Sequence, residues 1–332
     1  MPGSRRNRSL RFGPGIRMCI ADGEKGMSYR YKITLFTPTY NRAYILDTLY
    51  RSVQRQTFHD FEWLIVDDGS TDNTEKLIAG WMAEDNFFPI RYYRQKNGGK
   101  CRAINYGLDL AQGELFFIMD SDDYLTDNAL ERVAYWESTI AGKPMYMGVV
   151  GNRGTSETYS PNRPLGAPYR DGNVFERYPE YTDDVIDGEH AGVWYTEIHR
   201  KYKYPEFEGE NFMTPCIAWN RMANDGYKVR VFDEIIWVCN YLQDGLTMQG
   251  NLRFIKNPRQ DGLCQREKAE FLHYPIVEKM KMWYTFYCDH TFCEESYRLN
   301  KKQCAEYIGA PLIMIYAAAF LHGISRRMKR KQ

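Results

Sequence analysis

The sequence lacks the signals that mark several large classes of protein. Its eight cysteines are scattered with no CxxC pair, a pattern that indicates reduced thiols rather than a disulfide framework. It contains neither a GxGxxG fingerprint nor a Walker sequence, so a Rossmann dehydrogenase and a P-loop NTPase are without their defining motifs. Residues 1–26 hold no long apolar stretch of the kind a secretory signal needs. We therefore expect a cytoplasmic protein.

The sequence also has no large net charge of either sign. Lys and Arg number 44, Asp and Glu number 43, and the formal net charge is +1, so no global field recruits a polyanion and we expect no nucleic-acid partner. The hydrophobic share of 43% is enough for a sizeable core. A length of 332 residues fits one large domain or two ordinary ones.

The two ends of the chain differ from the rest. Residues 1–26 are rich in Arg and Gly, and we interpret them as a disordered tail or an upstream mis-start. Residues 308–324 carry no formal charge if His322 is neutral, and SRRMKRKQ follows them. The stretch is shorter than the ~20 residues that span a bilayer. A packed terminal helix and a helix lying in the membrane interface, with its basic tail against anionic lipid, both remain open.

Strand-like and helix-like segments alternate in the first half of the chain. Apolar and β-branched runs predict strands, and apolar residues at helical spacing follow each of them. This alternation predicts an α/β fold with a mostly parallel central sheet flanked by helices. The pattern loosens after Val150, and we expect residues 251–332 to form a helical extension. We predict strands at 32–38, 61–68, 90–95 and 114–120 and helices at 43–56, 71–84, 98–112 and 126–137.

Each of the four predicted strands ends in polar residues. The ends read TPTYNR, DDGSTDN, QKNGGK and DSDDYL. In open α/β sheets, ligands bind outside the carboxyl ends of the strands, so these four segments predict one site. Carboxylates such as those of DSDD are hard oxygen ligands for Mg²⁺ or Mn²⁺. The alternative for that motif alone is an acidic loop in which Asp123 or Thr126 caps the next helix.

Taken together, TPTYNRAYIL, SVQRQTFHDFEWLIVDDGSTDNT and NGGKCRAINYGLDLAQGELFFIMDSDD resemble the nucleotide-binding half of family 2 glycosyltransferases with the GT-A fold. The resemblance covers residues 32–136 and has its motifs in order and correctly spaced. It implies a glycosyltransferase domain over residues 27–250, with an acceptor half at 137–250. It also implies a nucleotide-diphosphate sugar donor, usually a UDP-sugar, and inversion at the anomeric carbon.

The resemblance assigns the residues nearest the nucleoside. Pro38, Thr39 and Tyr40 are expected to line the base and the ribose. Asp67 and Asp68 are expected to include the acceptor for a base N–H. The aromatic ring of Tyr40 could stack on a base, and a carboxylate can accept from an imide N–H or a ribose hydroxyl.

On the diphosphate side, Lys100 is expected to face the donor and Asp120 to reach the ribose or a metal. Asp122, together with Asp123, is expected to hold Mn²⁺ or Mg²⁺ on the diphosphate. The family also needs a general base, for which we choose Glu210, although the common aspartate of the family falls at Asn211 here. Glu210→Gln is then expected to keep donor binding and nearly abolish transfer.

The acceptor expected from these features is a glycan or a lipid-linked glycan of cell-envelope or capsule polysaccharide synthesis. The basic C-terminus adds a possible peripheral contact with the cytoplasmic face of a membrane. Two other readings stay open from the sequence, a catalytically silent nucleotide-sugar-binding protein and a nucleotidyltransferase. The latter normally has a basic glycine-rich loop where this chain has TPTYNR.

Overall fold

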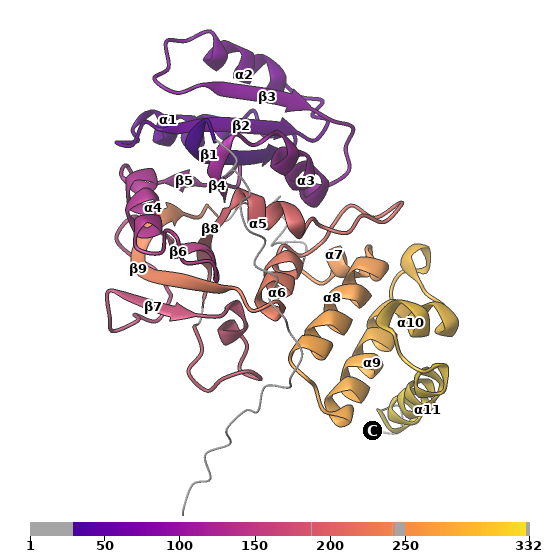
Figure 1. The fold of residues 1–332 in the computed structure, drawn as a ribbon. Helices are drawn as coiled ribbons and strands as arrows, with labels where there is room; N and C mark the ends of the chain where they lie inside the picture. Colours follow the sequence, from indigo (N-terminus) through magenta and orange to yellow (C-terminus); the bar gives the residue numbers. More distant parts are fainter. Residues whose placement is uncertain (1–28, 187, 241, 243–249, 330–332) are drawn as a thin grey trace, which may run out of the picture.

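Strands and helices alternate along the first half of the chain in the computed structural model (Figure 1). The structure describes residues 29–186, 188–240, 242 and 250–329, so the predicted tail at 1–26 lies outside the described residues. The elements up to residue 138 are β1 (Tyr31–Thr39), α1 (Leu46–Gln54), β2 (Phe61–Asp67), α2 (Thr74–Met82), β3 (Ile90–Arg94), α3 (Lys100–Leu110), β4 (Gly113–Ile118), β5 (Tyr124–Leu125) and α4 (Ala129–Ser138).

The described strands form a single sheet in the order β3-β2-β1-β4-β8-β6-β9-β5, and β7 pairs with β9. The later elements of the sheet region are β6 (Tyr146–Gly154), β7 (Tyr169–Gly172), β8 (His190–Tyr195), α5 (Thr196–Lys201), α6 (Cys216–Asn224) and β9 (Lys228–Val238). Pairing is parallel from β3 to β4 and between β6 and β9, and antiparallel where β8 joins β4 to β6. The α/β fold predicted from the alternation is therefore confirmed, and β4 stands where the two halves of the sheet meet.

Helices cover both faces of the sheet, and each face has its own hydrophobic core. Successive side chains of a strand point to opposite faces, so Leu35 of β1 packs in the core with α1, α2 and α4, whereas Phe36 packs in the core with α3, α5 and α6. Fully buried Trp63 and Trp136 fill much of the first core. Because both faces are covered, the strands read as nearly continuous apolar runs.

A charged side chain of β2 lies within the core of the sheet. Glu62 of β2 is fully buried and accepts hydrogen bonds from Thr34 Oγ1 (2.6 Å), the backbone N–H of Gln112 (2.7 Å) and the guanidinium of Arg91 (2.6 Å). A buried carboxylate is tolerated only where hydrogen bonds and an opposite charge replace its water. Arg91 supplies that charge from the neighbouring strand β3.

Arg91→Met is expected to lower the free energy of unfolding by about 3–5 kcal/mol, because the carboxylate of Glu62 would stay buried without a cation. Urea denaturation followed by circular dichroism measures the change. As a control, Arg51→Met removes an exposed ion pair with Asp47 on α1 and should cost about 0.5 kcal/mol or less. Equal stabilities of the two variants would show that Glu62 does not need its partner.

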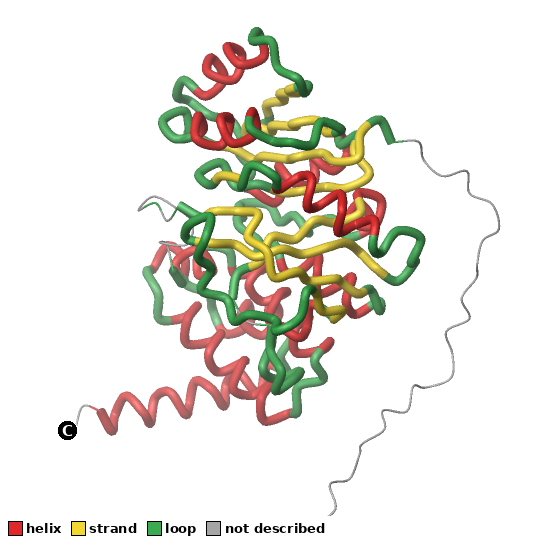
Figure 2. The backbone as a smooth tube through the Cα atoms, turned by 90° about the vertical axis from the view of Figure 1, so that its left-hand side faces the viewer, coloured by secondary structure: helices red, strands yellow, loops and turns green. Residues whose placement is uncertain are grey.

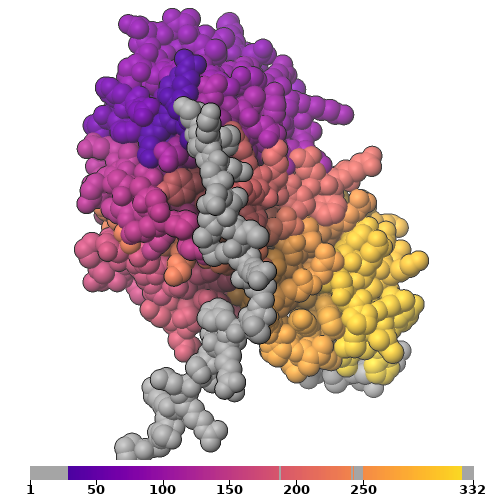
Figure 3. All heavy atoms as spheres, viewed as in Figure 1, coloured from indigo at the N-terminus to yellow at the C-terminus, as the bar shows by residue number. Residues whose placement is uncertain are grey.

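The C-terminal part of the chain is helical, as predicted, and packs around a third core that includes Trp283, Phe286 and Ile308. Its helices are α7 (Leu252–Ile255), α8 (Pro258–Phe271), α9 (Ile276–Thr291), α10 (Lys301–Ile308) and α11 (Leu312–Lys329). Figure 3 shows that α10 and α11 lie at the opposite end of the molecule from the first strands and helices.

The apolar stretch at 308–324 does not form one continuous helix. α10 ends at Ile308, where Gly309 takes a left-handed conformation (φ +71°), and α11 begins at Leu312 directly after Pro311. A left-handed glycine followed by a proline is a common way to end a helix. Within the described residues, no helix combines the length and the apolar character that crossing a membrane requires.

Candidate functional site

A cavity of about 990 Å³ lies at the carboxyl ends of β1, β2 and β4. The polar strand ends therefore do come together, as the sequence predicts. Asp67 and Glu210 do not line this cavity, whereas it extends to Arg153, His190 and Asn211 in the second half of the chain. The predicted site residues that line it are Pro38, Thr39, Tyr40, Asp68, Lys100, Asp120, Asp122 and Asp123.

Hydrogen bonds from Asn41 hold the loops after β1 and β2 together. Its backbone N–H donates to Ser70 Oγ (2.8 Å), and its side-chain oxygen accepts from the backbone N–H of Thr71 (2.7 Å). Asn41 has a φ of +53°, a conformation that asparagine adopts more readily than most residues. The turn leaves Tyr40 next to it 46% exposed at the cavity.

The two aspartates at the end of β2 have different surroundings. Asp67 is buried, and its oxygens accept from the backbone N–H of Ser70 (2.7 Å) and from Tyr92 Oη (2.7 Å), so it shapes the turn. Asp68 is also buried, but it lines the cavity. Its carboxylate accepts from the backbone N–H groups of Gly98 (2.9 Å) and Gly99 (2.7 Å) and from Gln95 Nε2 (2.7 Å). Of the predicted pair, Asp68 alone is in a position to meet a ligand.

Gly99 brings the loop before α3 against the second half of the chain. Its φ is +93°, and a Cβ atom there would lie 1.7 Å from the backbone carbonyl oxygen of Asn211. Only glycine fits both the conformation and the approach. The next residue, Lys100, thereby begins α3 at the floor of the cavity.

Lys100 forms an ion pair with Asp120, the first residue of DSDD. Burial alone would raise the pKa of Asp120, but the positive charges of Lys100 and Arg153, with the Lys100 hydrogen bond, hold that pKa below its ordinary value. In this structure Asp120 is therefore an anion whose negative charge neutralises the positive charge of Lys100. The predicted contact with ribose or metal stays a prediction.

The pKa values of Asp122 and Asp123 are raised, in contrast to that of Asp120. Burial and the negative charge of Asp120 raise the pKa of Asp122, whose nearest cation is the guanidinium of Arg42 at 3.9 Å. Asp123 is buried and accepts from Trp237 Nε1 (2.6 Å) and from the backbone N–H of Asn240 (2.7 Å), and burial with the charge of Asp120 raises its pKa to about 7. Both oxygens of Asp123 are thus engaged within the protein, whereas Asp122 is the more open ligand.

The alternative reading of DSDD as a helix cap is not supported for Asp123. Helix α4 begins at Ala129 after Asn128, and the carboxylate of Asp123 faces β9 instead. Through these hydrogen bonds, Asp123 links the DSDD motif to Trp237 at the end of β9 and to Asn240 just after it. The sequence contained no sign of this contact, because Trp237 is 114 residues away along the chain.

Glu210 does not occupy the position predicted for it. Its carboxylate accepts from the backbone N–H groups of Arg259 (2.9 Å) and Gln260 (3.0 Å), and the residue is buried. These N–H groups belong to the first turn of α8, where helix donors have no partner within the helix. The structure therefore gives Glu210 the role of a cap for α8 and directs it away from the cavity, which Asn211 lines.

Sequence reasoning missed two side chains on the far side of the cavity. Arg153 lies with its guanidinium 3.7 Å from the centre of the Trp237 ring and 3.8 Å from a carboxylate oxygen of Glu189. Both Arg153 and Glu189 line the cavity. They lie at a strand end and beside a strand start in the part of the sequence where periodicity was weak, so no pattern selected them.

The segment NYLQDGLT (residues 240–247) is either a DG turn or, through Asp244, part of the acceptor side. Most of this segment lies outside the described residues.

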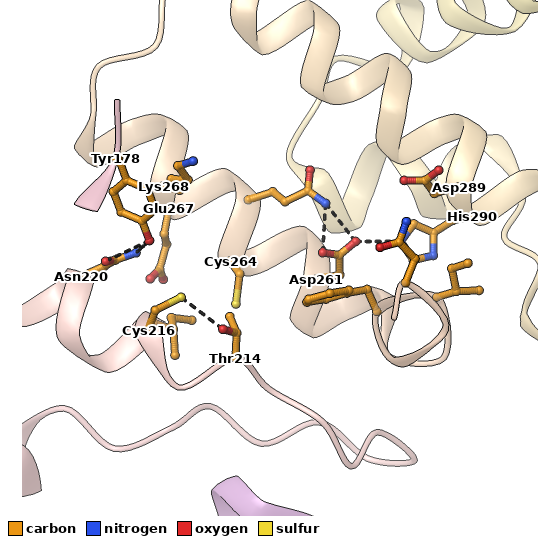
Figure 4. A pocket seen from close by; sticks show the side chains of 15 residues that line it. Tyr178, Thr214, Cys216, Asn220, Asp261, Cys264, Glu267, Lys268, Asp289 and His290 are labelled. Carbon is orange, nitrogen blue, oxygen red and sulfur yellow. Dashed lines mark hydrogen bonds and ion pairs between the residues drawn. The ribbon is translucent and has the colours of Figure 1, made fainter. Parts of the chain in front are cut away.

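A second, smaller pocket of about 350 Å³ lies among α6, α8 and α9 (Figure 4). His290 is fully buried there, with Nε2 2.9 Å from a carboxylate oxygen of Asp261. Cys216 and Thr214 line both this pocket and the large cavity. The described cysteines are all free thiols, including Cys288 and Cys293 of CDHTFC.

Comparison with known families identifies the family of this chain. The model described as Glycosyl transferase family 2 matches residues 34–221, which is more than half of the chain. Glycosyltransferase GlyG of Streptococcus pneumoniae is 37% identical over 100 residues, 30% of this chain and 33% of that protein. The GalNAc(5)-diNAcBac-PP-undecaprenol beta-1,3-glucosyltransferase of Campylobacter jejuni is 36% identical over 103 residues, 30% of this chain and 32% of that protein. The chain thus spans about a third of the length of these relatives.

Solved structures share the fold at low sequence identity. Residues 1–349 of S. aureus TarS, in complex with UDP-GlcNAc, align with a TM-score of 0.54 and 15% identity over 88% of this chain and 92% of that one. The mannosyltransferase PcManGT from Pyrobaculum calidifontis, in complex with GDP-Man and Mn²⁺, aligns with a TM-score of 0.54 and 17% identity over 88% and 87% of the two chains.

Proposed function

The chain belongs to family 2 of the glycosyltransferases, and on that premise we propose that it transfers a sugar from a nucleotide-diphosphate sugar to a hydroxyl group of an acceptor. One observation carries the donor side of this proposal. A single cavity at the strand ends combines the exposed ring of Tyr40, the carboxylate of Asp68, the ammonium of Lys100 and the acids of DSDD. These groups suit a base, a base N–H, and a diphosphate with its cation.

We propose a UDP-sugar as the donor. Tyr40 would offer its face to the base, with Pro38 and Thr39 beside it. Asp68 would accept a hydrogen bond from the imide N–H of uracil, and guanine presents a comparable N–H, so a GDP-sugar belongs in the same test. Lys100 would face the diphosphate once the donor competes with Asp120 for its ammonium.

A divalent cation, Mn²⁺ or Mg²⁺, fits the residues present. Asp122 lines the cavity, and its raised pKa reports a carboxylate that its surroundings do not fully stabilise. Among the described residues no group of three or more acidic, His or Cys side chains is arranged to enclose a metal. That suits an ion held by one or two carboxylates plus diphosphate oxygens and water. Bound there, the ion would offset negative charge on the departing nucleotide diphosphate.

We propose inverting transfer, in which one general base removes the proton from the acceptor hydroxyl and no protein nucleophile is needed. As that base we propose Glu189 in place of Glu210. Glu189 lines the cavity with its side chain 57% exposed, and the guanidinium of Arg153 lies 3.8 Å from its carboxylate. The carboxylates of Asp68 and Asp123, in contrast, already accept from backbone N–H groups.

The acceptor that we propose is a glycan or a lipid-linked glycan of cell-envelope or capsule polysaccharide synthesis, modified at the cytoplasmic face of a membrane. The Campylobacter jejuni relative, whose name includes an undecaprenol-linked glycan, supports the lipid-linked form. The match to that relative is confined to 30% of this chain, so the support concerns the class of acceptor.

A thermal-shift panel tests the donor. UDP-glucose, UDP-galactose, UDP-GlcNAc and GDP-mannose are each added with Mn²⁺ and again with EDTA, and the unfolding midpoint is measured. At a concentration of 100 times Kd, a ligand that binds only the folded protein adds about 2.7 kcal/mol to its stability. We expect one nucleotide class to raise the midpoint and Mn²⁺ to enlarge the rise. A panel in which no nucleotide sugar shifts the midpoint would refute the proposed donor class.

A further inference from the structure

The last helix of the chain packs through one side only. Ile315 and Ala318 of α11 are buried in the third core, and Met314 and Ala319 pack beside them against α9 and α10. The opposite side of α11 has no protein cover within the described residues. Figure 2 shows α11 extending away from the rest of the molecule toward the C-terminus.

The uncovered side, which we call the outward face of α11, consists of Leu312, Ile313, Tyr316, Phe320 and Leu321. Their exposed fractions are 43%, 75%, 55%, 70% and 56%. Ile313, Tyr316 and Phe320 are spaced three and four residues apart, so they share one side of the helix. Residues 312–323 include no Asp, Glu, Lys or Arg, so this face is wholly uncharged. So many large apolar side chains on one exposed helix indicate a surface that something covers.

Positive charge borders the outward face. Lys301 Nζ lies 4.9 Å from the centre of the Tyr316 ring, and Lys302 is exposed next to it on α10. The sequence after the face, SRRMKRKQ, has five basic residues and no acidic one. An apolar helical face with basic neighbours suits a membrane, which has an apolar interior and anionic headgroups at its surface.

We propose that the outward face of α11 lies in the interface of an anionic membrane, with its apolar side chains at the acyl boundary and Lys301 and Lys302 against the headgroups. The inference rests on the proposed function, because it would bring the cavity to a lipid-linked acceptor. A second copy of the chain is a weaker occupant, since a two-fold contact through this face would bring like charges together. In the proposed arrangement the axis of α11 lies along the membrane surface.

Vesicle co-sedimentation of the full chain, without donor or acceptor, tests the proposal. We expect at least about tenfold tighter binding when phosphatidylglycerol replaces part of the phosphatidylcholine in the vesicles. The double variant Ile313→Ser, Phe320→Ser should lower that binding about tenfold or more, because two apolar side chains no longer enter the interface. Met82→Ser, which changes a 50% exposed residue on α2, is the matched control and should bind as the wild type.

Equal binding to neutral and anionic vesicles, or undiminished binding by the double variant, would overturn the proposal. So would a dimer in sedimentation velocity that the double variant dissociates, because the outward face would then belong to a second copy. The same variant run through the nucleotide-sugar panel keeps the two proposals apart. In the double variant, unchanged donor stabilisation with weakened vesicle binding is the expected result. In the wild type, donor stabilisation without vesicle binding counts against the membrane contact alone, and vesicle binding without donor stabilisation counts against the donor alone.

Discussion

Replacing Asp122 with asparagine is expected to lower kcat/KM for sugar transfer about 10³-fold, a loss of several kcal/mol of transition-state stabilisation. Asparagine keeps the size of the side chain and removes its negative charge. Residue 122 would then no longer hold a divalent cation against the diphosphate. A readout that does not need turnover is the thermal shift with UDP, whose Mn²⁺-dependent part should disappear in the variant.

Asp127→Asn is the control for this prediction. Asp127 lies five positions further along the chain, beyond β5, is exposed, and pairs with Arg55 on the surface. Its neutralisation should leave both the rate and the Mn²⁺-dependent shift within about twofold of the wild type, because an exposed ion pair contributes little. If Asp122→Asn keeps a wild-type rate and metal requirement, the ligand lies elsewhere.

The second large effect is expected at Glu189. Glu189→Gln should lower kcat about 10²–10⁴-fold, the usual contribution of a general base, with little change in the KM for the donor. A glutamine amide cannot take up the proton of the acceptor hydroxyl. Initial rates of nucleotide release with the donor that the thermal-shift panel selects measure both constants.

Glu210→Gln makes the same chemical change at a carboxylate that caps α8. We expect kcat per folded molecule to be unchanged and the free energy of unfolding to fall by about 1 kcal/mol, because the helix N-terminus loses a charged acceptor. The opposite result, with turnover lost in Glu210→Gln and kept in Glu189→Gln, would restore the base that the sequence predicted.

The parts of the site that could be predicted depend on local patterns. β1, β2 and β4 are apolar runs buried on both faces, so the sequence shows where each strand ends. Parallel strands place their carboxyl ends on one edge of the sheet. That argument suffices to bring Tyr40, Asp68 and Asp120 together, without any knowledge of the second half of the chain.

The parts that could not be predicted depend on partners far away in the sequence. The helix that Glu210 caps begins 48 residues later, at Pro258, so the sequence around Glu210 gives no sign of this partner. Asp123 likewise accepts hydrogen bonds from Trp237 and Asn240, which follow it by 114 and 117 residues in the sequence. An acidic residue looks the same in the sequence whether its carboxylate binds a ligand or accepts a hydrogen bond from a distant N–H group.

The contact between Gly99 and Asn211 has a consequence for evolution. Every possible replacement of Gly99 adds a Cβ atom 1.7 Å from the Asn211 carbonyl oxygen, so the mutant must also move the segment around Asn211. Single substitutions at position 99 are therefore expected to be selected against. Changes in the segment around Asn211 must likewise keep this segment close to the backbone of Gly99, which carries no side chain. Among chains related to this one, the loop before α3 and the segment before α6 should have diversified together.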